Sequence, residues 1–148
     1  MSATNLFEDD LLDLIFTNVD APNVGDAAGL QNSASAGSFH ISLHTGDALS
    51  DTDTLQTASE AAYTNYARQA VARSVAGWTV ASGNVDNDSA ISFPQSASGP
   101  ETETDVGIGY ALSGAGVLQI WSQLVADLVV NSGITPEFAA GALDVSLD

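Results

Sequence analysis

Alternation of apolar and polar positions is clearest in residues 105–124, where two β-type runs flank a glycine-containing turn at residues 113–116. Two such runs joined by a few residues that include glycine predict a β-hairpin. In the first run, Gly107 and Gly109 alternate with large apolar residues and leave room for a close-packed neighbour. Because a lone hairpin is barely stable in water, we expect further strands to cover this pair.

A helical period appears only near the N-terminus, over residues 5–18. Asn5 can cap this helix, and Glu8 stands three residues later, where a capping-box acid is expected. Apolar residues recur at helical spacing at Phe7, Leu11, Leu14 and Ile15, while Leu12 and Phe16 lie outside that stripe. The helix is therefore apolar on more than one side. It could close the end of its own sheet, or it could present one face to a neighbouring subunit.

Shorter period-two runs predict the remaining strands. The expected strands are residues 39–45, 63–74 (where a strand is favoured over a helix), 78–82, 90–93, 126–130 and the closing segment 138–147. Between them we expect an arm at 19–37, a loop at 46–60 and a turn at 83–88.

These elements predict a mainly β fold, an antiparallel β-sandwich or barrel-like domain with one N-terminal α-helix. The expected organisation is an N-terminal helix and arm over residues 1–37, followed by a β-sandwich domain over residues 38–148. A chain of 148 residues is long enough to bury a core of its own.

The two histidines lie in the strand predicted at 39–45. Phe39, Ile41 and Leu43 should face the core, which puts His40 and His44 on the exposed face. Residues four apart on a strand are separated by roughly 13 Å, too far to bind one metal ion. We therefore expect two exposed histidines and no shared metal site.

Other candidate ligands for a metal or cofactor are weak. Asp51 and Asp53 could touch a divalent cation, but their loop lacks the glycine and distal glutamate of a calcium loop. Cysteine is absent, so there is no thiolate site. We expect neither a metal nor a cofactor.

Charge is scarce and one-sided. The chain has 19 Asp and Glu against two Arg and no Lys, a formal charge of −17. Such a chain repels phosphate backbones and anionic membranes, and no apolar run approaches the roughly 20 residues of a membrane-spanning helix. Arg68 is expected to form an internal ion pair or a fork onto backbone carbonyls; a contact to another subunit is the alternative.

Signatures of catalysis are missing from the sequence. It has no nucleophile elbow, P-loop or dinucleotide fingerprint, and no acid stands beside either histidine, so we do not expect an enzyme. Trp78 and Trp121 are expected in the core. An exposed shelf of Tyr63, Tyr66 or Tyr110 would instead favour a carbohydrate-binding β-sandwich module.

The order of segments resembles a family of small tailed-phage virion proteins, described as head-decoration (cement) or tail-fibre-like proteins. The resemblance is carried by FHISLHTGD (39–47), YARQAV (66–71), ISFP (91–94), VGIGYALSGAGVLQIWSQL (106–124) and FAAGALDVSLD (138–148), in that order after a short N-terminal helix. It spans nearly the whole chain.

This resemblance implies a structural virion protein without catalysis, made in the host cytoplasm. The preferred role is a decoration protein on the outer capsid surface that stabilises the shell by binding the major capsid protein and itself, with a trimer as one possibility. A tail-fibre-like or baseplate protein is the alternative. The candidate interface residues are Phe7, Leu11, Leu12, Ile15, Phe16, Pro22, Arg68 and Arg73.

Overall fold

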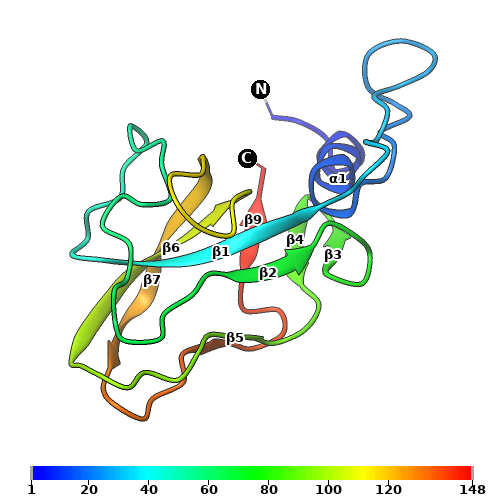
Figure 1. Ribbon diagram of the computed structural model, residues 1–148. Coiled ribbons are helices and arrows are strands. Elements are labelled where there is room, and N and C mark those ends of the chain that lie inside the picture. The colour runs from blue at the N-terminus through cyan, green and yellow to red at the C-terminus, as the bar shows by residue number, and fades with distance from the viewer. Residues whose placement is uncertain (1, 148) are drawn as a thin grey trace. The chain divides into compact units, whose positions relative to one another are not determined.

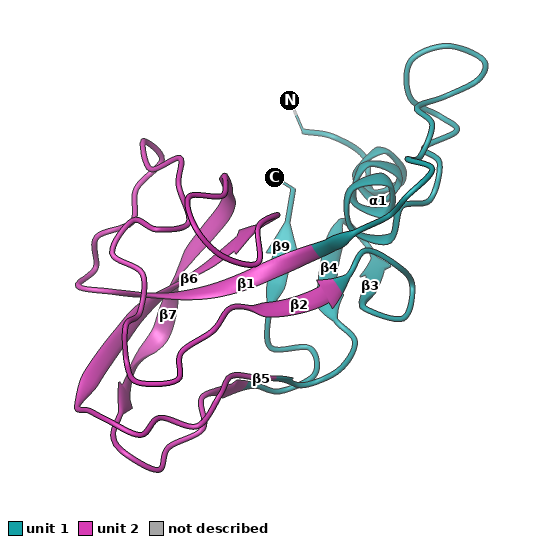
Figure 2. Cartoon of the chain, in the orientation of Figure 1, with its two compact units in different colours: residues 1–38, 72–91, 138–148 teal, residues 39–71, 92–137 magenta. Residues whose placement is uncertain are grey.

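The computed structural model describes residues 2–147, which form two compact units (Figure 2). Unit 1 contains the residues up to 38, residues 72–91 and the residues from 138 onward. Unit 2 contains residues 39–71 and 92–137. The predicted division into an N-terminal region (1–37) and a β-sandwich domain (38–148) remains a prediction. The first and last residues of these predicted domains, 1 and 148, lie outside the described residues.

Unit 1 begins with the helix α1 (Asn5–Leu12), which continues into a π-helical turn, η1 (Asp13–Thr17) (Figure 1). The predicted cap is one residue off, because Thr4 is the capping position and Asn5 is already helical. The chain leaves the helix at Asn18, whose φ of 59° is left-handed. Asparagine tolerates this conformation better than most residues, which suits it to the end of a helix. The predicted end of the helix at residue 18 is confirmed, because η1 ends at Thr17 and Asn18 is its capping residue.

The sheet of unit 1 is antiparallel, in the order β3 (Trp78–Ala81), β4 (Asn84–Asn87), β9 (Asp144–Ser146). The turn predicted at 83–88 is therefore wrong. Ser82 and Gly83 both have positive φ and form the tight turn by themselves, which frees the following residues to pair as β4. Val85 of β4 is fully buried, and Phe16 packs edge-on against Trp78 at 4.9 Å between ring centroids.

The sheet of unit 2 has the order β2 (Gln69–Ala72), β1 (Ser38–Thr45), β6 (Glu101–Gly109), β7 (Leu118–Val130). β6 and β7 pair antiparallel, which confirms the predicted hairpin. Asp105 lies opposite Gln123, but Glu103 lies opposite Leu128, so residues 124–127 of β7 stand against Thr104 alone and form an irregular bulge. The strand predicted at 126–130 is the end of β7.

The strand predicted over residues 63–74 is correct only for β2, and residues 63–68 are irregular. The Tyr66 hydroxyl donates to Glu60 and accepts a hydrogen bond from the backbone N–H of Leu43, so this segment is fixed by side chains. The short strands β5 (Ile91–Ser92) and β8 (Glu137–Phe138) form a further pair.

All register pairs described between strands are antiparallel, and α1 is a short N-terminal helix. The predicted fold class, a mainly β chain of antiparallel sheets with one N-terminal α-helix, is therefore confirmed, and it is consistent with a β-sandwich-like protein.

Candidate functional site

The polar face of β1 is buried, contrary to the prediction of two exposed histidines. Ser42 and His44 have no exposed surface, and His40 is half-buried. The reason is the loop at 46–60, which covers this face: the side-chain amide of Gln56 donates to the His40 carbonyl at 3.0 Å. Period-two alternation identifies the two faces of a strand but does not show that a loop will cover the polar one.

His44 is held in one tautomer by two neighbours. Its Nδ1 lies 2.7 Å from the Ala58 carbonyl oxygen, which can only accept, so Nδ1 carries the proton. Nε2 then accepts a hydrogen bond from the Ser42 hydroxyl at 2.8 Å. Burial lowers the pKa of His44 and favours this neutral form. A Ser–His pair of this kind resembles a nucleophile and its base, but its complete burial closes it to a substrate.

Two acidic side chains of β6 are also fully buried, Glu103 and Asp105. One carboxylate oxygen of Asp105 accepts from the Thr104 hydroxyl, whereas neither oxygen of Glu103 receives a hydrogen bond from the described residues. Burial and the neighbouring Glu101 carboxyl raise the pKa of Glu103 to about 8. With this pKa Glu103 keeps a proton at neutral pH, and the Glu101 side chain beside it accepts the backbone N–H groups of Ala62 and Tyr63.

The glycines of β6 have the role that the sequence predicted. A Cβ on Gly107 would lie 2.6 Å from His44 Nε2, and a Cβ on Gly109 would lie 2.2 Å from Gln56 Cδ. Only glycine fits at such distances, so the prediction of close packing is confirmed. The sequence did not identify Gln56 as the neighbour.

Gln56 and Arg68 fix the connection between β6 and β7, which we call the hairpin tip (residues 110–117). Gln56 accepts the Ala111 N–H with its side chain and donates its own backbone N–H to the Gly116 carbonyl. Arg68 donates to the carbonyls of Ala111 at 2.9 Å and Gly114 at 2.8 Å. The backbone of the hairpin tip is thus held by four hydrogen bonds from inside unit 2.

Arg68 is itself held by Glu60, with Nε to Oε1 at 2.6 Å and Nη2 to Oε2 at 2.7 Å. The predicted internal ion pair and the predicted fork onto backbone carbonyls are both confirmed. The side chain is almost fully buried in unit 2, and a contact of Arg68 with another subunit remains a prediction. This two-bond geometry is specific to arginine and orients both residues.

Three apolar side chains of the hairpin tip are exposed. Tyr110 is 58% exposed, Leu112 62% and Val117 43%. Leu55 pairs with Val117 through an isolated antiparallel bridge and is also exposed. The hairpin tip thus exposes apolar side chains on a loop whose backbone is fixed.

The predicted interface residues of α1 and η1 divide into exposed and buried groups. Phe7 and Ile15 are exposed, Leu11 is half-buried, and Leu12 and Phe16 are buried in the core of unit 1. An interface at the exposed positions remains a prediction. Leu6, which the periodicity did not select, is 61% exposed on the same helix.

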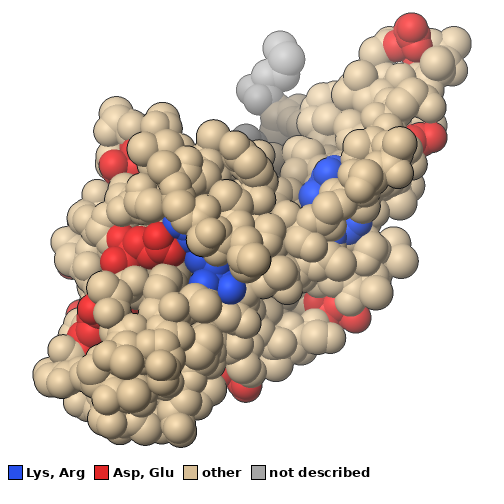
Figure 3. All heavy atoms as spheres, in the orientation of Figure 1, with Lys and Arg blue, Asp and Glu red and all other residues tan. Residues whose placement is uncertain are grey.

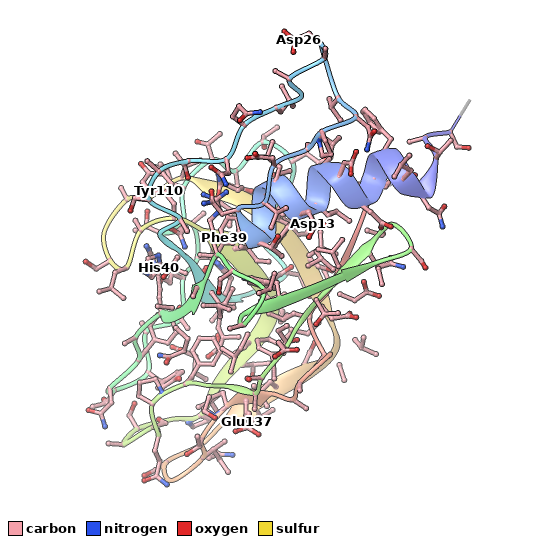
Figure 4. The ribbon with its side chains drawn as sticks, turned by 90° about the vertical axis from the view of Figure 1, so that its right-hand side faces the viewer. Asp13, Asp26, Phe39, His40, Tyr110 and Glu137 are labelled. Atoms are coloured by element: carbon pink, nitrogen blue, oxygen red, sulfur yellow. The ribbon has the colours of Figure 1, made fainter. Side chains whose placement is uncertain are left out.

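The arm at 19–37 is closed on itself rather than extended. Ala21 and Leu30 exchange two backbone hydrogen bonds, and Pro22 lies exposed just beyond this closure. Figure 4 shows Asp26 at the outer bend of the arm, away from the helical turn that carries Asp13.

Arg73 fixes the base of the arm to the helix. It donates to the carbonyls of Leu14 and Ile15 at the end of the helix and to that of Ala36 at the end of the arm. A cation at a helix C-terminus also complements the helix dipole. Arg73 therefore bonds within unit 1, and a role at an interface remains a prediction.

The aromatic rings do not form the shelf that a carbohydrate site would need. Tyr63 and Trp78 are buried, and the Tyr66 hydroxyl is bonded inside unit 2. Trp121 is half-buried, with its N–H on Asp51 at 3.3 Å. Tyr110 is the exposed ring among the three candidate tyrosines.

Acidic side chains occur in separate groups over the face shown in Figure 3, with two small basic groups among them. Within residues 2–147, no cluster of three or more His, Asp or Glu side chains is arranged to hold a metal ion. In the same part of the chain, no helix has the length and apolar character to cross a membrane.

The chain is thus a small, mainly β protein in which the hairpin tip and the arm are held in place by hydrogen bonds and expose some apolar side chains. The model of the family described as "Podophage GP4 fiber I protein gp80" matches residues 2–146. The chain therefore belongs to this family and is a structural protein of the bacteriophage virion. A search of curated proteins found no match to the chain.

Proposed function

We propose that this protein is a non-catalytic subunit of a virion fibre that joins other virion proteins by surface contact. The observation that carries the proposal is the match of the fibre-protein family over nearly the whole chain. The chain has no internal repeat of the kind that builds a long shaft. It is suited to a junction or a short segment of the fibre.

The exposed side of the helical segment α1–η1 around Phe7 and Ile15 is the proposed attachment surface in unit 1. Both residues expose apolar side chains, and Arg73 fixes the end of this helical segment. Apolar groups on a rigid element lose little conformational entropy on binding, which favours tight contacts. The burial of the Ser42–His44 pair supports the non-catalytic part of the proposal, because a hydroxyl and an imidazole that are closed to solvent cannot reach a substrate.

Capsid decoration is the second candidate, and the charge of the chain favours it. With 19 acidic and two basic residues, the protein is suited to the outside of a shell and not to its DNA-lined inside. In that role it would bind the major capsid protein and raise the temperature at which DNA is released.

Gold-labelled antibodies against the purified protein, imaged on intact virions by electron microscopy, test the proposal. We expect label on the fibres at constant positions. Label spread evenly over the capsid would favour decoration, and virions that carry no label after mild permeabilisation would contradict a structural role.

A further inference from the structure

Two carboxyl groups lie next to each other on β6. Glu103 has no exposed surface, and neither of its carboxylate oxygens receives a hydrogen bond from the described residues. Glu101 stands two positions earlier on the same strand, and its carboxyl group is within hydrogen-bond reach of Glu103. A protonated carboxyl can donate to a carboxylate, so one proton shared by this pair satisfies the buried group.

Glu101 also anchors the chain that follows the loop at 46–60. Its Oε1 accepts the backbone N–H groups of Ala62 at 2.8 Å and of Tyr63 at 3.0 Å. We call residues 61–68 the anchoring segment, because it ends at Arg68, which holds two carbonyls of the hairpin tip. The position of the Glu101 side chain therefore bears on the segment that supports the tip.

The elements around Glu103 offer it no free positive charge. Their titratable groups are Glu101 and Asp105 on β6, Tyr63 on the anchoring segment, His44 on β1 and Asp127 on β7. Burial lowers the pKa of His44 and keeps it neutral, and Arg68 is occupied by Glu60. Loss of the proton from Glu103 thus places a second negative charge beside Glu101, without a cation among these groups to offset it.

We propose that the Glu101–Glu103 pair is a proton-operated latch for the anchoring segment. While the pair shares a proton, Glu101 stays beside Glu103 and holds the amides of Ala62 and Tyr63. Once the proton is lost, repulsion between the two carboxylates and the demand of Glu103 for water favour a local opening, in which both amides lose their acceptor. Ionisation thus loosens the segment from which Arg68 supports the hairpin tip.

The direction of the pH dependence follows from the protonation of the two states. Burial and Glu101 raise the pKa of Glu103 to about 8 in the closed state, and in the opened state the carboxyl returns toward its ordinary value of 4.5. The opened state binds fewer protons between these values, so opening becomes more favourable as the pH rises and levels off above about 8. Each pH unit within the range changes the opening equilibrium by up to about tenfold.

Hydrogen exchange of the full chain, read by mass spectrometry and divided by the intrinsic exchange rate at each pH, tests the latch. We expect the protection of residues 61–68 to fall about tenfold or more between about pH 6 and pH 8, and about twofold or less from there to about pH 9. Urea at about 1 M should change this exchange by less than about twofold, since a local opening exposes little surface. Exchange through global unfolding would instead change by about tenfold.

Two variants separate the latch from a general effect of charge. Glu103→Gln keeps a side chain of similar shape without its titration, so the protection of residues 61–68 should vary by less than about twofold over the same pH range. Asp127→Asn removes an exposed carboxylate from the same unit and should retain the full drop. Circular dichroism confirms that each variant is folded.

Protection of residues 61–68 that is independent of pH in the unchanged protein would overturn the latch, as would a drop that persists in Glu103→Gln. A drop with the urea dependence of global unfolding would overturn it too, because Glu103 would then meet water only when the whole chain unfolds. The latch acts within one chain, so these results do not bear on the proposed function, which the labelled virions decide.

Discussion

Replacing Glu103 by glutamine should stabilise the protein at neutral and high pH. Burial and Glu101 raise the pKa of Glu103 to about 8 in the folded chain, against an ordinary value of 4.5. In the unfolded chain the carboxyl ionises near its ordinary value, so the unfolded state releases a proton that the folded state keeps. The contribution of Glu103 to stability therefore falls as the pH rises from about 4.5 to about 8 and is constant above that range.

The size of the effect follows from the two pKa values. At about 1.4 kcal/mol per pH unit, the buried carboxyl costs about 3 kcal/mol at pH 7 and about 5 kcal/mol above pH 9. Glu103→Gln removes this titration, and its amide can donate to the Glu101 carboxylate. The expected gain in the free energy of unfolding is about 3 kcal/mol at pH 7 and near zero at about pH 4.5.

Urea denaturation of both proteins at several pH values between about 4.5 and 9 measures this difference directly. The two histidines have lowered pKa values, so they weaken the fold only as the pH falls, and they cancel in the comparison. Asp127→Asn, at an exposed position in the same unit, should change stability by no more than about 0.5 kcal/mol. A gain from Glu103→Gln that does not vary with pH, or a loss at pH 8, would refute the reasoning.

Three further changes test the local packing. Gly109→Ala should cost about 1–3 kcal/mol in urea denaturation, and somewhat less in a Gln56→Ala background, where the clash of the added Cβ with the Val117 carbonyl at 2.5 Å remains; equal costs in both backgrounds would contradict the close approach of Gly109 and Gln56. Arg68→Lys should lower the free energy of unfolding by about 2 kcal/mol and lower the Tm, since lysine cannot make the two parallel hydrogen bonds of Arg68 to Glu60. An unchanged Tm would contradict a stabilising role of this contact. Asn18→Ala should lose about 1–2 kcal/mol and speed proteolysis in the arm, because Asn18 has a left-handed φ and makes three hydrogen bonds to Ser33. Asn18→Gly should fall between Asn18→Ala and the unchanged protein, and identical proteolysis of all three would contradict this role.

Local periodicity predicted the elements whose pattern is complete within the segment. The hairpin, the strand containing the histidines and the N-terminal helix all depend on spacing that can be read over about ten residues. β4 was not predicted, because Asn84, Asp86 and Asn87 are residue types typical of turns. These residues form a strand because β3 and β9 pair with them on the two sides. Tertiary pairing overrode the local preference.

The candidate site was predictable only in part. Gly107 and Gly109 indicated a close neighbour, and Arg68, one of two cations, indicated an internal pair. The neighbour, Gln56, lies in a loop without periodicity, so its burial depends on how the loop folds back over β1. Glu103 shows the same limit, since an acid in a polar run gives no signal that it will be fully buried.

The copy number of this protein in purified virions, determined by quantitative mass spectrometry against the other virion proteins, tests the central claim most directly. A structural subunit of the virion should be present in a fixed, multiple copy number that survives repeated purification. A protein that is abundant in infected cells but absent from purified particles, or present only in variable traces, would contradict the account.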